Sequence, residues 1–106
     1  MKAEFTVFRD FDGYWLVDSE VAAKVEANPE FYRFGAVKVS TKIAACRLAL
    51  SKAVEIGADE LHIYGVGGTT SVSNEARQVG IKPFIYHPSI TTDLTSQYHA
   101  KHRRPI

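Results

Sequence analysis

The glycine-rich segment at residues 65–71 is the part of this sequence best suited to bind a ligand. It directly precedes a predicted helix, and glycines leave the amides of a helix N-terminus open to phosphate oxygens. The segment lacks the Lys-Ser/Thr pair of Walker A and the complete dinucleotide fingerprint. We expect phosphate contacts here, although a tight strand-to-helix corner would use the same glycines. The candidates are three glycines and three hydroxyl residues: Gly65, Gly67, Gly68, Thr69, Thr70 and Ser71.

Two carboxylates, Asp10 and Asp12, are the second candidate, because a pair of acids could hold a metal ion. They occur in the sequence Asp-Phe-Asp-Gly between two strand-like segments, residues 5–9 and 14–17. This pattern is a strong signal for a β-hairpin. We favour the turn, because aspartate side chains there commonly accept hydrogen bonds from nearby backbone amides.

A nuclease of the RNase-H-like class is the catalytic alternative, and it would need further acids to hold two divalent metals. The first predicted helix has Ala44, Ala45 and Cys46 where such an acid would be needed. The next strand ends at Tyr64, and Val66 follows where a second acid would be needed. We therefore expect no metal site, no cofactor and no catalysis.

Helix and strand signals alternate over residues 40–86 and must position the glycine segment. Ser40 or Thr41 can cap the first helix, because a side-chain oxygen accepts an unpaired amide proton of the first turn. Gly57 can end that helix in the left-handed conformation. Strand, helix and strand at this spacing predict a parallel pair joined by a crossover. The expected order is helix 43–56, strand 60–64, helix 72–79 and strand 82–86.

The length of 106 residues fits one domain with one modest core. We predict a single α/β domain over residues 1–94, with an N-terminal antiparallel hairpin and then helix, strand, helix and strand. The path of residues 18–39 is left open. Cys46 is the single cysteine and is expected to be a small buried apolar group. We expect no membrane span and, from the first residues, no cleaved leader.

Charge is distributed unevenly along the chain although the formal net charge is only +1. Residues 1–30 carry three basic and seven acidic residues, a balance of −4, whereas residues 31–56 carry five basic and one acidic, a balance of +4. The last twelve residues add three basic residues and no acid. Separated charge of this kind points to a polyanionic partner.

Two segments have the composition of a surface for nucleic acid. Arg33 and Lys38 alternate with aromatic residues, which suits base stacking and phosphate neutralisation, although Phe31 and Phe34 would serve equally as core residues. The tail, residues 95–106, is either solvated or folds on contact with nucleic acid. The tail has two histidines but no cysteine or further histidine near them, so it cannot form a closed zinc site. Its candidate contacts are His99, Lys101, His102, Arg103 and Arg104.

Taken in order, these motifs resemble the small-subunit ribosomal protein S-eleven family over nearly the whole chain. This chain differs at residues 68–71, where the family continues glycine, arginine, glutamate, and it lacks the basic N-terminal arm. The matching segments are Arg33-Phe34-Gly35, Ser40-Thr41, the alanine-rich helix 43–56, residues 57–61, the turn Gly65-Val66-Gly67, Gly80-Ile81 and the basic residues 101–104.

The resemblance implies an RNase-H-like mixed sheet on the platform of the small ribosomal subunit, without catalysis. Its partners would be rRNA near the mRNA exit, neighbouring platform proteins and mRNA itself. The implied location is the ribosome, in the mitochondrial matrix or otherwise in a bacterial-type cytoplasm. A small anion-binding or protein-binding module without a ribosomal role is the remaining alternative.

Residue roles follow from the same resemblance. Gly65 and Gly67 would hold the glycine turn against backbone phosphates. The basic residues Lys101, Arg103 and Arg104 would form the terminus that contacts RNA. Five residues before the first helix would line rRNA: Arg33, Lys38, Ser40, Thr41 and Lys42.

Overall fold

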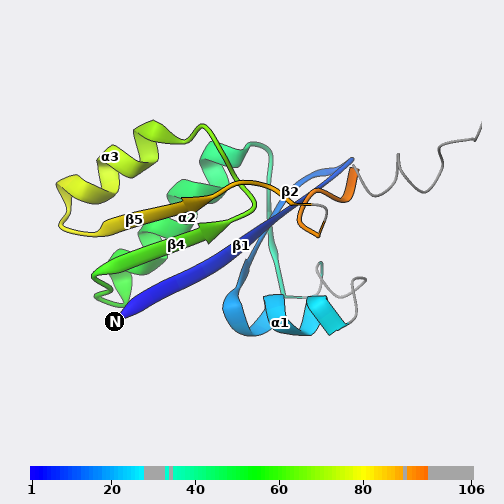
Figure 1. Ribbon diagram of the computed structural model, residues 1–106, viewed down its shortest axis with the longest axis horizontal. Coiled ribbons are helices and arrows are strands. Elements are labelled where there is room, and N and C mark those ends of the chain that lie inside the picture. The colour runs from blue at the N-terminus through cyan, green and yellow to red at the C-terminus, as the bar shows by residue number, and fades with distance from the viewer. Residues whose placement is uncertain (28–32, 34, 90, 96–106) are drawn as a thin grey trace, which may run out of the picture.

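The protein is an α/β domain built on one mixed sheet, as the computed structural model shows for residues 1–27, 33, 35–89 and 91–95 (Figure 1). In these residues the strands lie side by side in the order β3-β2-β1-β4-β5. The elements in chain order are β1 (Lys2–Asp10), β2 (Gly13–Asp18), α1 (Ser19–Ala27), β3 (Val37–Val39), α2 (Lys42–Glu55), β4 (Glu60–Tyr64), α3 (Thr70–Gln78) and β5 (Lys82–Tyr86).

The sheet combines an antiparallel half with a parallel half. β2 pairs antiparallel with both β1 and β3, whereas β4 pairs parallel with both β1 and β5. The predicted fold class is therefore confirmed: an N-terminal hairpin is followed by helix, strand, helix and strand with a parallel pair. The prediction did not include the pairing of β1 with β4, which joins the two halves.

α2 begins and ends at the residues expected from the sequence. Thr41 is its N-cap, and Thr41 Oγ1 accepts a hydrogen bond of 3.1 Å from the amide of Ala44. Gly57, just beyond the helix, has a φ of 73°, which glycine adopts without a steric penalty.

The main core lies between the sheet and the two helices α2 and α3, which cover the same face (Figure 1). Small residues let α2 approach the sheet closely, and Ala45, Cys46 and Ala49 are completely buried. The burial expected for Cys46 is confirmed. Ile43 and Val54 of the same helix are 38% and 51% exposed, so its apolar residues extend beyond the buried face.

α1 covers part of the opposite face of the sheet and occupies a segment whose path the sequence left open. Asp18 Oδ1 accepts a hydrogen bond of 2.9 Å from the amide of Val21 in the first turn. Val25 is buried against Phe8 and Val17, which project from β1 and β2. The expectations for Phe31 and Phe34 lie outside the described residues.

Within the part of the chain that the structure describes, no helix is both long and apolar enough to cross a bilayer.

Gly65 is the glycine at which we expect a substitution to be most damaging. Its φ is 92°, and a Cβ atom would collide with the carbonyl oxygen of Val7 in the neighbouring strand. Gly65→Ala should lower the free energy of unfolding by about 3 kcal/mol or more, because a left-handed penalty and a backbone clash combine. Urea denaturation of the purified variant measures this loss.

Gly57→Ala is the matched control, because Gly57 also has a positive φ, 73°, but no atom lies within 4 Å of the position that a Cβ atom would take there. It should lose only about 1 kcal/mol. Equal losses for both variants would contradict the close packing of Gly65 against β1.

Candidate phosphate-binding site

A small crevice lies where the carboxyl ends of β1 and β4 meet. The chain leaves β1 toward β2 and leaves β4 toward α3 and β5, so the two connections diverge at this point. Open α/β sheets commonly bind ligands at such a divergence. The crevice has a volume of about 90 Å³, and Arg9, Lys42, Gly65, Gly67 and Asp93 contribute to its lining.

The glycine segment forms one wall of this crevice. Gly68 has a φ of 65°, and Gly67 packs so close to His87 that a Cβ atom there would lie 2.8 Å from the imidazole Nδ1. These two positions therefore favour glycine for different reasons, conformation and space. The segment leads directly into α3. The amides of the first turn point outward from the N-terminus of that helix.

Thr69, the N-cap of α3, is buried without a hydrogen-bond partner for its side chain. The residue is only 3% exposed, and its hydroxyl makes no cap interaction. Among the residues described, Oγ1 makes no hydrogen bond of acceptable geometry, although it lies close to the thiol of Cys46. A buried hydroxyl without a hydrogen bond carries a desolvation cost. Thr69 follows the glycines that line the crevice but is not itself part of the lining.

Two cations accompany the helix terminus. The Nζ atom of Lys42, in the first turn of α2, lies beside Gly68, where a methyl group would be 3.6 Å from it. Arg9, at the end of β1, places its guanidinium 5.9 Å from the centre of the Tyr14 ring. The helix terminus and both cations give this crevice the electrostatics of an anion site.

The segment after β5 closes the crevice on one side and adds an acid. The amide of Arg9 donates a hydrogen bond of 2.9 Å to the carbonyl of Thr92, and Asp93 forms a parallel bridge with Arg9. Asp93 Oδ1 accepts hydrogen bonds from the amide and hydroxyl of Thr95, at 3.2 and 2.5 Å. This carboxylate offsets part of the positive charge.

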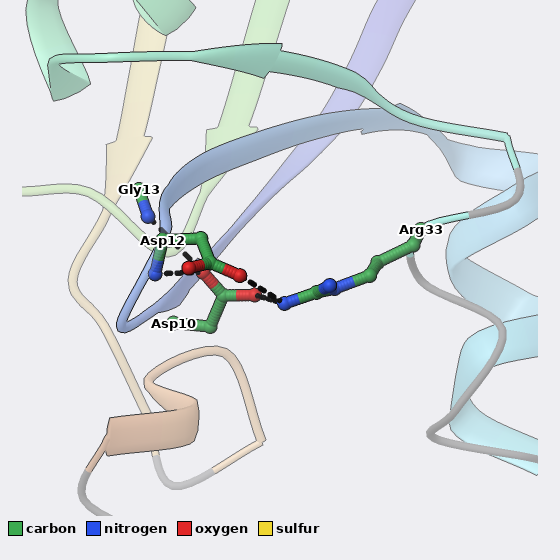
Figure 2. A network of polar contacts seen from close by, with 4 residues as sticks. All are labelled: Asp10, Asp12, Gly13 and Arg33. Atoms are coloured by element: carbon green, nitrogen blue, oxygen red, sulfur yellow. Dashed lines mark hydrogen bonds and ion pairs between the residues drawn. The ribbon is translucent and has the colours of Figure 1, made fainter.

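Asp10 acts as a turn residue, which confirms the interpretation favoured from the sequence. Its Oδ1 atom accepts hydrogen bonds from the amides of Asp12 and Gly13, at 2.8 and 3.1 Å. Figure 2 shows the guanidinium of Arg33 reaching both carboxylates, with Nη2 2.7 Å from Asp10 Oδ2 and 2.7 Å from Asp12 Oδ2. Across the described residues, no group of three or more His, Cys, Asp or Glu side chains could hold a metal ion.

Arg33 and Lys38 lie on the Trp15 ring, away from the glycine segment. The Arg33 guanidinium carbon is 4.8 Å and the Lys38 Nζ 5.6 Å from the ring centre. Their RNA contacts remain a prediction. Ser40 is exposed just before the cap of α2.

The structure thus brings together only part of the predicted site. Lys42 joins the glycine segment, whereas the five tail candidates lie outside the described residues: His99, Lys101, His102, Arg103 and Arg104. The sequence did not indicate Arg9, Thr92 or Asp93. No local signal could have done so, because they meet the site only through the pairing of β1 with β4 and the return of the chain after β5.

Comparisons with family models, curated proteins and solved structures found no significant match.

Cys46 is expected to be chemically inert in the folded protein. Burial raises the pKa of its thiol to about 11, and the nearby Thr69 hydroxyl and Lys42 ammonium counter only part of that shift. At pH 8 the native thiol should react with a disulfide reagent at least about 100-fold more slowly than the unfolded chain, since two pKa units separate the thiolate fractions. Stopped-flow absorbance with and without denaturant tests this.

The raised pKa of the Cys46 thiol makes the stability of the fold depend on pH. A thiol whose pKa is raised in the folded state stabilises the fold fully below its unfolded pKa. This contribution should be lost as pH rises from about 9, the ordinary pKa of the group, through about 11, its pKa in the folded protein. Rapid modification of the native thiol at pH 8 would contradict the described burial.

Thr69→Val should stabilise the ligand-free protein. Valine keeps the shape of threonine and removes the buried hydroxyl that has no partner among the described residues, so we expect a gain of about 1 kcal/mol in the free energy of unfolding. Thermal denaturation measures the gain. Thr69→Ser is the control, since it keeps the hydroxyl; a loss of stability in Thr69→Val but not in Thr69→Ser would show that the hydroxyl is already paired.

Proposed function

We propose that this domain binds the phosphate backbone of RNA through the crevice at the ends of β1 and β4, and that it does so without catalysis. The observation that carries the proposal is the position of Lys42, whose ammonium lies beside the glycine turn at the N-terminus of α3. Arg9 lines the same crevice from β1. Gly65 and Gly67 line it from the turn that leads into α3.

The size of the crevice favours a backbone phosphate over a free organic ligand. Pockets for complete small molecules commonly have volumes of about 300 Å³ or more, whereas this crevice has about 90 Å³. It can therefore enclose one tetrahedral group of a longer polymer. The concentration of positive charge in residues 31–56 and in the last twelve residues supports a polymer with many phosphates.

The more specific form of the proposal follows from the ribosomal resemblance. In that form the domain is a structural constituent of a small ribosomal subunit, binding rRNA beside other platform proteins, and mitochondria are the favoured compartment. The basic tail would add contacts to the same RNA. The nuclease alternative is weaker, because Asp10 and Asp12 are both paired with Arg33.

Lys42→Gln should weaken the binding of a structured RNA by about tenfold, the effect of losing one charge-assisted hydrogen bond of about 1.5 kcal/mol. The slope of log affinity against log salt should also become shallower by about 0.7 to 0.9, corresponding to one phosphate contact. Fluorescence anisotropy over a salt series measures both quantities.

Lys52→Gln is the matched control, because it removes the same charge from the last turn of the same helix. Ten residues of helix place Lys52 about 15 Å from Lys42 along the axis. Similar losses for both variants would indicate diffuse electrostatics and contradict a phosphate site in the crevice.

The ribosomal form makes a separate prediction. The full-length protein should sediment with a small ribosomal subunit in a sucrose gradient containing magnesium and moderate salt. If it stays at the top of the gradient with magnesium and with EDTA, the domain binds RNA outside the ribosome or not at all.

A further inference from the structure

The sheet carries a row of stacked aromatic rings on the face opposite to α2 and α3. Tyr64 of β4 lies in register between Thr6 of β1 and Tyr86 of β5. The Tyr64 and Tyr86 rings stack with their centres 4.3 Å apart and their planes at 6°. One face of the Tyr64 ring is therefore covered by Tyr86, and the other turns toward β1.

A second pair of stacked rings lies next to the Tyr64–Tyr86 pair. His62 stacks on Phe84 with ring centres 4.4 Å apart and planes at 8°. The Nδ1 atom of His62 lies 3.0 Å from the hydroxyl oxygen of Tyr86, within hydrogen-bond distance. His62 is itself only 9% exposed. These contacts fix the orientation of Tyr86 and, through it, that of Tyr64.

A cleft of about 510 Å³ lies on the β1 side of Tyr64. Thr6 and Phe8 form its floor on the sheet, and Ala22 and Ala23 of α1 form the facing wall. Its volume is in the range of pockets that enclose small organic ligands. The cleft thus combines a flat aromatic wall with small side chains opposite, which leaves room for a planar ring.

We propose that this cleft binds a nucleobase, which stacks on the free face of Tyr64 and extends the row of rings by one member. Aromatic side chains bind bases in this way without needing a particular sequence. The lining also carries polar groups that could hydrogen-bond the base or its ribose: Glu4, Thr6, His87, Ser89 and Thr91.

The cleft and the phosphate crevice are neighbours. Gly65 and Thr92 line both cavities, and His87 of the cleft packs against Gly67 of the crevice. A nucleotide could therefore place its phosphate at the glycine turn and its base against Tyr64. This step rests on the proposed function and makes it more specific: the RNA would present an unpaired nucleotide, because the bases of a duplex are already stacked.

Tyr64→Leu tests the inference directly, since it removes the flat ring at a residue that is 37% exposed. Two probes are used: adenosine monophosphate, and a single-stranded oligoribonucleotide containing 2-aminopurine, whose fluorescence is quenched by stacking. We expect Tyr64→Leu to weaken the binding of at least one probe by about five- to 100-fold. It should also abolish the quenching.

Two control variants separate stacking from other effects. Tyr64→Phe keeps the ring and should bind within about twofold of the unchanged protein. Phe11→Leu removes an aromatic ring, 63% exposed, from the hairpin turn and should have no effect. Circular dichroism confirms that each variant is folded before binding is measured.

The results show whether the base belongs to a free nucleotide or to RNA. They also test the nucleobase site and the phosphate crevice separately. Loss of monophosphate binding in Tyr64→Leu supports a free nucleotide, whereas loss of oligonucleotide binding alone supports unpaired RNA. Equal affinity of Tyr64→Leu and the unchanged protein for both probes would overturn the nucleobase site. Lys42→Gln then tests the phosphate crevice separately, because a Lys42-dependent affinity that is insensitive to Tyr64 would leave the proposed function standing.

Discussion

The parallel pairing of β1 with β4 is the constraint on which the rest of the structure depends. It brings Gly65, the first residue after β4, against the backbone carbonyl of Val7. The amides of Gly65 and Val66 then both donate to the carbonyl of Tyr86, at 3.1 and 3.0 Å, so the chain turns tightly over the end of the sheet. Gly65 therefore lines both the crevice and the cleft beside Tyr64.

The electrostatics of the domain follow from the same arrangement. Lys42 and Arg9 are 33 positions apart in the chain, and the fold places them on one small cavity with the carboxylate of Asp93. In contrast, Arg33 forms ion pairs with two carboxylates at the hairpin turn (Figure 2). Its guanidinium also lies over the Trp15 ring. The sequence alone does not distinguish a basic residue that lines the crevice from one that pairs with carboxylates. The partners of each basic residue come from distant segments of the chain.

The local parts of the fold could be predicted from the sequence because their causes are local. The cap of α2 at Thr41, its end at Gly57 and the turn around Asp10 each depend on a few neighbouring residues and their hydrogen bonds. The glycine segment was found for the same reason, since its composition and its position before a helix are visible in the sequence.

The remaining features depend on contacts between distant segments. α1 is short, and burial of Val25 against Phe8 and Val17 stabilises it. Arg9 lines the crevice only because β4 lies beside β1, and the cleft beside Tyr64 exists only because α1 and the segment after β5 flank the same face of the sheet. None of these pairings leaves a periodic or compositional signal in a single sequence.

The most direct measurement is a nuclear magnetic resonance titration of the ¹⁵N-labelled protein with a short single-stranded oligoribonucleotide. If the crevice holds a backbone phosphate, the largest amide shifts should fall on Gly67, Gly68, Thr69 and Thr70, where the turn meets α3. Shifts confined to the hairpin turn and the Trp15 surface, with the glycine segment unchanged, would contradict the phosphate site.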